Sequence, residues 1–367
     1  MSGTSMDGID VAMLSSDGEG WIEFGPSISC GYSPSDRTLL ERALVDAAQI
    51  RIRTERLGAL GDAEAMIIQR HVEAVGQFLK VNNLRPSDID LIGFHGQTVL
   101  HRPDERLTVQ IGDGHMLARE LGIDTVFDMR AADIAAGGQG APLVPVFHEA
   151  LATRLHIEGP ICFVNIGGIS NITYLREGDP PVAFDTGPGN ALIDQWMQTV
   201  GGIPYDAAGA IASEGQVVGT VVERYMATPY FQKTLPKSLD RLDFPALDPS
   251  EADLSDGARS LARLTAEAIF AGLDHLPEPP KNWIVCGGGR HNRAIMSDLR
   301  ELAGEYSASV HSAEDVNLDG DMMEAQAFAY LAIRARADLP LTFPTTTGCP
   351  QPMSGGVFAP AKEAKDA

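Results

Sequence analysis

A glycine-rich turn that occurs once in each half of the chain constrains the fold more than any other feature. In the first half, Ser2-Gly3-Thr4-Ser5-Met6-Asp7-Gly8 leads into the apolar run 9–14. In the second half, the apolar run 161–165 enters a turn with Gly167-Gly168, and the run 172–175 follows it. Hairpin tips of this composition present backbone N–H groups and hydroxyls to an anion. The repeated pattern predicts a duplicated α/β architecture in which two lobes close on one anion.

One acidic residue, Asp185, stands out because it follows the apolar run 182–184 and precedes Gly187-Pro188-Gly189. This order predicts a carboxylate at the mouth of a strand, followed by a helix over 191–200. An aspartate at a glycine-proline turn often serves only to order the turn. Near anion-binding turns it also suits a phosphoryl-transfer enzyme, which needs one residue to take a proton from the nucleophile. The residues alone leave both interpretations open.

A third glycine cluster, Gly287-Gly288-Gly289, follows the apolar run 283–286 and precedes a helix that extends to about residue 302. A strand, a glycine turn and a helix start in this order are typical of a nucleotide site. The cluster matches neither the GxGxxG nor the GxxxxGK[ST] pattern, so neither a dinucleotide fold nor a Walker loop is predicted.

Three polar residues are candidates for contact with a substrate. His95 follows a predicted strand over 90–94, Arg130 follows one over 123–127, and Glu324 lies near the start of a predicted helix over 319–337. Open α/β sheets bind ligands beyond the carboxyl ends of their strands. We interpret His95 as a hydrogen-bonding ligand contact. Arg130 and Glu324 could contact a polar substrate or could be surface or inter-lobe charges.

The sequence offers one candidate metal pair. Asp7 and Asp10 could hold Mg²⁺ through water, because Mg²⁺ prefers carboxylate oxygens and keeps its waters; either could equally be a turn acid. The spacing of His95, His101 and His115 matches no zinc motif. His71 lies on the apolar stripe of a long helix predicted over 54–81, so we expect a core histidine.

Length and composition bound the remaining possibilities. A chain of 367 residues favours two domains, and we expect an N-terminal lobe at 1–130, a C-terminal lobe at 131–344 and a tail at 345–367 that returns to the first lobe. The net charge of −22 argues against nucleic acid and anionic membranes as main partners. The four cysteines form no paired motif, and no segment has a signal-peptide or membrane-spanning pattern. We expect a cytoplasmic protein.

Several motifs together resemble the anhydro-N-acetylmuramic acid kinases, a family of the acetate and sugar kinase/Hsp70/actin superfamily. The resemblance covers essentially the whole chain. The motifs that carry it are Ser2 to Asp10, Phe94-His95-Gly96-Gln97-Thr98, Asn165-Ile166-Gly167-Gly168-Ile169-Ser170-Asn171, Phe184-Asp185-Thr186-Gly187-Pro188-Gly189-Asn190, Cys286-Gly287-Gly288-Gly289, Pro236-Lys237-Ser238, Met323-Glu324-Ala325 and Thr346-Thr347-Gly348.

The resemblance implies a two-lobed actin-like/sugar-kinase (ribonuclease H-like) fold with a duplicated mixed-sheet core and a cleft between the lobes. It implies phosphorylation of 1,6-anhydro-N-acetylmuramic acid by Mg-ATP, with water added across the anhydro bond. The product is N-acetylmuramic acid 6-phosphate, in recycling of peptidoglycan and its amino sugars. We also expect a homodimer.

The resemblance also assigns roles to residues of this chain. Asp185 matches the catalytic base, and His95, Arg130 and Glu324 match the sugar pocket. The implied ATP-binding residues are Gly3, Thr4, Ser5, Met6, Asp7, Gly8, Ile9, Asp10, Asn165, Gly167, Gly168, Gly287, Gly288 and Gly289.

The chain departs from the family pattern at one end and leaves two rival functions open. Members carry an apolar strand before the Ser-Gly-Thr turn, and here Met1 stands in its place, so we expect a misplaced start or a truncated sequence. One rival function is a kinase of the same fold acting on another amino sugar, such as N-acetylglucosamine. The other is a non-catalytic, actin-like ATP-binding module.

Overall fold

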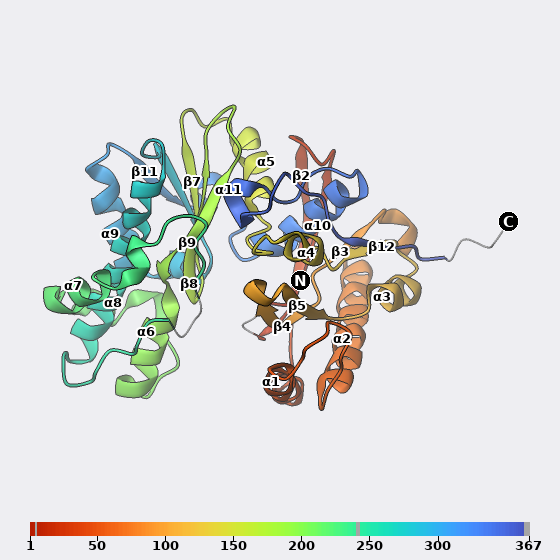
Figure 1. The fold of residues 1–367 in the computed structure, drawn as a ribbon, viewed down its shortest axis with the longest axis horizontal. Helices are drawn as coiled ribbons and strands as arrows, with labels where there is room; N and C mark the ends of the chain where they lie inside the picture. Colours follow the sequence, from red (N-terminus) through yellow and green to blue (C-terminus); the bar gives the residue numbers. More distant parts are fainter. Residues whose placement is uncertain (4–5, 240–242, 363–367) are drawn as a thin grey trace. The chain divides into compact units, whose positions relative to one another are not determined.

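The chain forms two compact units, which we describe separately. The computed structural model describes residues 1–3, 6–239 and 243–362, so Thr4 and Ser5 of the predicted ATP-binding set lie outside the described residues. Unit 1 comprises Met1–Arg154 together with Met322–Ala367, and unit 2 comprises Leu155–Asp321 (Figure 1). The predicted boundaries were 130 and 344. The first unit extends to 154 and so includes the helices that follow 130, and the second boundary lies at 321 because the helix after residue 322 packs within unit 1.

Unit 2 is built on a five-stranded mixed sheet. The strand order is β11(Ser309–Ser312), β10(Asn282–Cys286), β7(Ile161–Ile166), β8(Ile169–Leu175) and β9(Val182–Pro188). β11, β10 and β7 are parallel, whereas β8 and β9 are antiparallel to their neighbours. Because β7 is at the centre of the sheet, residues 161–164 are fully buried, and the strand is apolar on both faces.

Helices cover this sheet and complete the unit. They are α6(Asn190–Trp196), α7(Gly219–Met226), α8(Leu254–Ala271) and α9(Arg293–Gly304), with the short helical segments η3(Met197–Gly201), η4(Ala207–Gly209), η5(Ala212–Glu214), η6(Pro229–Gln232), η7(Gly272–His275), η8(Gly288–His291) and η9(Glu314–Val316). α8 packs against α6, α7, α9 and β9, so it is the central helix of this core.

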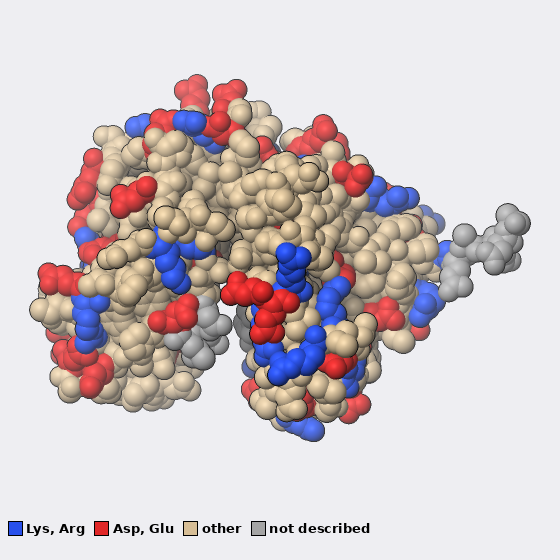
Figure 2. Space-filling view, viewed as in Figure 1, with Lys and Arg blue, Asp and Glu red and all other residues tan. Residues whose placement is uncertain are grey.

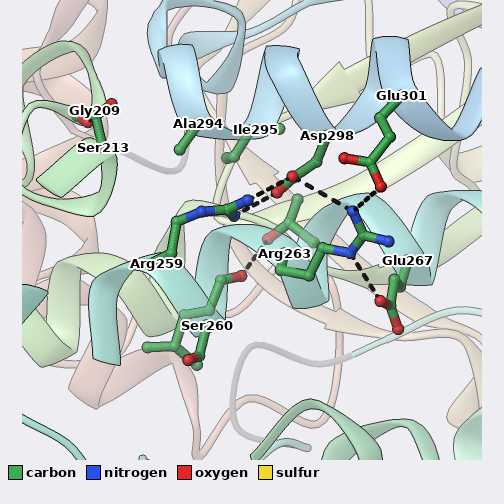
Figure 3. Close-up of polar contacts among 12 residues, drawn as sticks. Gly209, Ser213, Arg259, Ser260, Arg263, Glu267, Ala294, Ile295, Asp298 and Glu301 are labelled. Atoms are coloured by element: carbon green, nitrogen blue, oxygen red, sulfur yellow. Dashed lines mark hydrogen bonds and ion pairs between the residues drawn. The ribbon is translucent and has the colours of Figure 1, made fainter. Parts of the chain in front are cut away.

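A buried ionic network joins α8 to α9 (Figure 3). Asp298 of α9 is 1% exposed and accepts two hydrogen bonds from Arg259 of α8, at 2.6 and 2.7 Å. Arg263, one turn further along α8, contacts Asp298 at 3.4 Å and also pairs with Glu267 and Glu301. A buried carboxylate is tolerated only when it is paired in this way.

Unit 1 contains three separate β-structures. They are the hairpin β1(Gly8–Ser16)–β2(Ile22–Gly31), the mixed sheet β12(Val357–Ala359)–β6(Thr125–Phe127)–β3(Ile92–Phe94), and the hairpin β4(Gln97–Arg102)–β5(Leu107–Ile111). The pairing of β12 with β6 brings the C-terminal segment into this unit. Each unit thus has an α/β architecture with a mixed sheet, as the sequence predicts.

The helices of unit 1 come from both ends of the chain. They are α1(Pro34–Ala47), α2(Leu60–Val81), α3(Gly114–Leu121), α4(Ala131–Ala136), α5(Pro145–Leu155), α10(Met323–Arg336) and α11(Pro344–Thr347), with η1(Pro86–Asp88) and η2(Pro103–Glu105). The predicted helix over 54–81 begins only at Leu60, because Gly58 adopts a left-handed conformation (φ +53°). His71 is buried, as predicted, with Nδ1 2.7 Å from the Ile67 carbonyl.

The described surface carries both signs of charge. Figure 2 shows acidic and basic side chains interspersed on one face of the molecule. Among the described residues, which include all four cysteines, no disulfide forms. None of the described helices has the length and apolar character that a membrane crossing requires.

Candidate active site

Asp185 lies inside β9 rather than at the mouth of a strand, so that prediction was wrong. The ladder with β8 continues past it, because Ser170 pairs with Gly187 and Ile169 with Pro188. The strand ends only where the Gly189 N–H reaches the Gly168 carbonyl at 2.9 Å. The expected helix follows, as α6 and the π-helical segment η3.

Three hydrogen bonds with other described residues hold Asp185 in place. Its Oδ2 accepts from the Leu239 N–H at 2.8 Å, and its carbonyl accepts from the Tyr230 hydroxyl at 2.6 Å. Its own N–H donates to the Lys237 carbonyl at 3.3 Å. The segment with Pro236-Lys237-Ser238 therefore fixes both the backbone and the carboxylate of Asp185.

The environment of Asp185 tunes its basicity. Desolvation raises the pKa of this carboxyl to about 6, while the Leu239 N–H and the charge of Lys237 oppose the rise. The Lys237 ammonium lies over the rings of Phe184 and Tyr230, 5.3 and 5.1 Å from their centres, and 3.2 Å from His275 Nε2. At neutral pH the carboxylate is mostly ionised and can still accept a proton, as a general base must.

Asp185 belongs to a row of polar residues that crosses three strands. Asn165 of β7 pairs with Asn171 of β8, which in turn pairs with Asp185 of β9. Directly opposed residues in antiparallel strands share a face, so the three side chains lie on the same side of the sheet. The sequence motif contained Asn171, but it was not singled out as a site residue. The missed signal was its position in the return strand, opposite Asn165.

The glycine turns of unit 2 meet at the carboxyl ends of β7 and β10. Cys286 pairs with Asn165, so Gly287 starts where β7 ends. Gly287 has φ +72°, and a Cβ there would lie 2.3 Å from Asn165 Oδ1; a Cβ on Gly289 would lie 2.2 Å from Ile166. The Asn190 N–H donates to the Gly167 carbonyl at 2.7 Å. The structure thus brings Asn165, Gly167, Gly168 and Gly287 to Gly289 together, and only glycine fits two of these positions.

Backbone hydrogen bonds also close the glycine-rich turn in the first half of the chain. Met1 and Asp10 exchange two backbone hydrogen bonds, at 2.8 and 2.9 Å, on either side of the turn. Met6 adopts the left-handed conformation at φ +54°, and its N–H donates to the Gly3 carbonyl at 3.2 Å. Gln97 supports the turn from the motif after β3, because its Nε2 donates to the Gly3 carbonyl at 3.1 Å.

His95 and Arg130 meet inside unit 1. His95 Nδ1 lies 3.1 and 2.9 Å from the carbonyls of Ser2 and Gly96, so this nitrogen must carry the proton. Nε2 is then the acceptor for Arg130, 3.1 Å away. Burial and the Arg130 charge hold the pKa of His95 well below its usual value, which agrees with a neutral ring.

One donor of Arg130 has no partner among the described residues. Its second amino group donates to the Gly140 carbonyl at 2.8 Å, but its buried Nε has no hydrogen-bond partner among the described residues. Glu324, near the start of α10, keeps part of its surface exposed to solvent. The protein around its carboxyl desolvates it and raises its pKa, while the charge of Arg130 opposes that rise. The three predicted sugar-pocket residues therefore belong to one unit and are electrostatically coupled.

The carboxylates of Asp7 and Asp10 fit the donor chemistry of Mg²⁺. Asp7 is exposed, and Asp10 is partly buried, with Oδ1 accepting from the Ser29 hydroxyl at 2.6 Å. Neither residue belongs to a closed metal cage, because the described residues contain no group of three or more potential His, Cys, Asp or Glu ligands. This donor set suits an ion that arrives with a phosphate ligand and its own waters.

Comparison with known proteins decides the family. The model of the family described as anhydro-N-acetylmuramic acid kinase matches residues 1–361. The chain belongs to the anhydro-N-acetylmuramic acid kinase family. It is therefore a kinase, and the non-catalytic alternative is set aside.

Relatives with this name support the assignment over nearly the full length. The Agrobacterium fabrum anhydro-N-acetylmuramic acid kinase is 52% identical over 363 residues, covering 98% of this chain and 97% of the relative. The Brucella canis protein is 52% identical over 97% of this chain and 96% of its own. The Rhizobium etli protein is 51% identical over 98% of this chain and 97% of its own.

Solved structures of other proteins are only distantly similar. An activator of 2-hydroxyisocaproyl-CoA dehydratase from Clostridium difficile, with bound ADPNP, aligns over 89% of this chain and 94% of its own at a TM-score of 0.40 and 12% identity. A ligand-bound xylulose kinase from Lactobacillus acidophilus aligns over 47% of this chain and 38% of its own, at a TM-score of 0.30 and 12% identity. Neither similarity is high enough to support an inference about this chain.

Proposed function

We propose that this kinase phosphorylates 1,6-anhydro-N-acetylmuramic acid with ATP and opens the 1,6-anhydro ring with water, giving N-acetylmuramic acid 6-phosphate and ADP. The observation that carries the proposal is the Asp185 carboxylate, whose pKa of about 6 and fixed orientation suit a general base at neutral pH. This reaction belongs to recycling of peptidoglycan and its amino sugars in the cytoplasm.

In the proposed reaction, Asp185 takes a proton from a water molecule as the water oxygen bonds to the anomeric carbon. The bond from that carbon to the bridging oxygen breaks, and the oxygen stays on C6. It then bonds to the γ-phosphorus, and ADP leaves. The Leu239 N–H holds the carboxylate, so one oxygen keeps its direction while the other accepts the proton.

We assign ATP to the two glycine turns. The turn at Gly3 to Asp10 and the segments around Gly167 and Gly287 would bind the nucleotide, because their glycines let backbone N–H groups approach phosphate. When bound, Mg²⁺ neutralises charge on the phosphates, and Asp7 and Asp10 would hold it through water.

We assign the sugar to His95, Arg130 and Glu324. The unpartnered Nε of Arg130 would donate to a sugar carboxylate or hydroxyl, and the neutral His95 accepts a hydrogen bond from the guanidinium. Glu324 can accept from a sugar hydroxyl. A homodimer is part of the same proposal, and light scattering of the purified protein would measure it.

The decisive experiment is turnover in ¹⁸O-labelled water with ATP and the anhydro sugar. We expect one ¹⁸O atom at C1 of the product for each ADP released, because water is the nucleophile at that carbon. ADP release without label at C1 would contradict ring opening by water. Faster turnover of N-acetylglucosamine than of the anhydro sugar would instead favour a kinase of another amino sugar.

A further inference from the structure

Asn171 lies between Asn165 and Asp185 on one face of the unit 2 sheet. β7, β8 and β9 are neighbours in that sheet (Figure 1), and each of the three residues is opposite the next. The adjacent residues Ile172 and Phe184 belong to the apolar core that includes residues of α8. Since successive side chains of a strand alternate, Asn171 and Asp185 lie on the sheet face directed away from that core.

The backbone of Asp185 shows that its side chain is close to that of Asn171. Its N–H donates to the Lys237 carbonyl at 3.3 Å, and its carbonyl accepts from the Tyr230 hydroxyl at 2.6 Å. Both groups therefore point away from β8, so Asn171 and Asp185 form a non-hydrogen-bonded antiparallel pair. In such pairs the side chains are closest, with about 4.5–5.5 Å between Cβ atoms.

A β-bulge keeps Asn171 opposite Asp185. Ser170 pairs with Gly187, so Thr186 is one extra residue in β9. The Ser170 and Thr186 hydroxyls lie 2.8 Å apart, and Ser170 Oγ also donates to the Gly187 carbonyl at 3.1 Å. Both of these side chains are fully buried. Their bonds fix the register of the two strands at the pair that contains the carboxylate.

Two hydrogen-bond acceptors lie side by side at this pair. The carboxamide of Asn171 is partly buried and makes no hydrogen bond within the part of the chain that the structure describes. Asp185 Oδ2 accepts from the Leu239 N–H, whereas Oδ1 has no partner among the same residues. One water molecule can donate an O–H to each of these side chains, and its lone pairs then point away from the sheet.

We propose that Asn171 is a second catalytic residue, whose carboxamide oxygen accepts one O–H of the water molecule that Asp185 deprotonates. The proposal rests on the function proposed above. As the water oxygen bonds to the anomeric carbon, one proton passes to Asp185. The other proton stays on the oxygen, which becomes the C1 hydroxyl. Its hydrogen bond to Asn171 turns the attacking lone pair toward the carbon.

A neutral acceptor suits this position better than a second carboxylate. The described titratable groups around Asp185 are Tyr230 of η6 and Lys237, and Lys237 also contacts His275 of η7. None of these three carries a negative charge at neutral pH, and the carboxamide of Asn171 adds none. A carboxylate in its place would repel the charge of Asp185, and one of the two groups would then keep its proton to a higher pH.

The test compares the full-length wild type with Asn171→Leu, Asn171→Asp and the control Thr173→Val. Thr173 is the next residue on the same face of β8, and its buried hydroxyl has no hydrogen-bond partner among the described residues. For each form, kcat, the KM for ATP, the kcat/KM profile against pH and the ¹⁸O content at C1 are measured in labelled water. Thermal unfolding checks the fold, and Asn171→Asp decides the question if leucine is not tolerated.

The three variants should differ in specific ways. We expect Asn171→Leu to lower kcat about 10²-fold, because the water loses its orientation. The KM for ATP should stay within about twofold of the wild-type value. Asn171→Asp should move the acidic limb of kcat/KM to higher pH by about one unit or more. Thr173→Val should match the wild type in every measurement.

The wild type separates this proposal from the function on which it rests. Wild-type product without ¹⁸O at C1 would contradict ring opening by water, and the proposed role of Asn171 would fall with it. If the wild type incorporates the label but Asn171→Leu keeps the wild-type kcat, the proposal fails and the proposed function stands. A higher KM for ATP at unchanged kcat would assign Asn171 to the nucleotide instead. An acidic limb that does not move in Asn171→Asp would contradict its place beside the base.

Discussion

In the proposed reaction, Asp185 is the general base. That role requires an ionised carboxyl, and desolvation raises the pKa of this group to about 6. We therefore expect kcat/KM to fall tenfold per pH unit below about 6 and to level off above it, because the protonated form cannot act as a base.

Replacement of the base tests the same point. Asp185→Asn preserves the shape of the side chain but removes its charge, and we expect turnover to fall by roughly 10² to 10⁴ while ATP binding is retained. Coupled ADP release and calorimetric titration measure the two quantities. A variant that keeps the wild-type pH profile would show that another group is the base.

Lys237 is the neighbour of Asp185 that we expect to set the pH below which kcat/KM falls. Its charge lowers the pKa of Asp185, against the larger effect of desolvation. Lys237→Met removes the charge but keeps a long side chain over Phe184 and Tyr230. We expect the acidic limb of the kcat/KM profile to move to higher pH, and Lys237→Arg to leave it nearly in place. A uniform loss of rate with an unmoved limb would contradict this role.

At the scale of elements, the contact between α8 and α9 depends on one buried charge. Asp298→Ala would leave Arg259 and Arg263 without the carboxylate that neutralises them, so we expect a loss of about 3–5 kcal/mol in the free energy of unfolding. Glu301→Ala is the matched control, because Glu301 pairs with the same Arg263 but is 66% exposed, and we expect about 0–1 kcal/mol. Urea unfolding measures both, and equal losses would contradict a special role for the buried pair.

Local sequence patterns predicted where helices and strands form better than where each of them ends. The apolar runs 161–165 and 283–286 located β7 and β10 to within one residue of their observed bounds, because a glycine turn follows each of them. The extension of β9 beyond Asp185 was missed, since Gly187 and Pro188 normally end a strand, and only the ladder with Ile169 and Ser170 keeps them in one.

Candidate site residues could be predicted from sequence where the residue type itself indicates a chemical role. Asp185, His95 and the glycines of the turns could be named from sequence, because few other residues serve in such positions. The contacts of Lys237 and Leu239 with Asp185 could not be predicted, because a separation of more than fifty residues leaves no periodic signal. The unpartnered Nε of Arg130 likewise emerges only from the packing around it.

At the scale of the whole molecule, charge is the dominant feature. A net charge of −22 makes the folded chain repel itself, and dissolved salt screens that repulsion. We expect the thermal midpoint at pH 7.5 to rise by a few degrees between about 10 and 200 mM NaCl, measured by calorimetry. The rise should shrink as the pH approaches 4.7, the isoelectric point of the sequence. A midpoint that falls with salt at pH 7.5 would mean that attractive ion pairs outweigh the net repulsion.

Unit 1 is discontinuous in sequence, and this has a consequence for how the protein is made. α10 packs against β1 and β3, yet it is encoded after the whole of unit 2. On the ribosome, unit 2 can form from one uninterrupted stretch as soon as it emerges, whereas the first 154 residues must wait for residues 323–336. The N-terminal part of the nascent chain is therefore the last to be completed and the longest in need of chaperone protection.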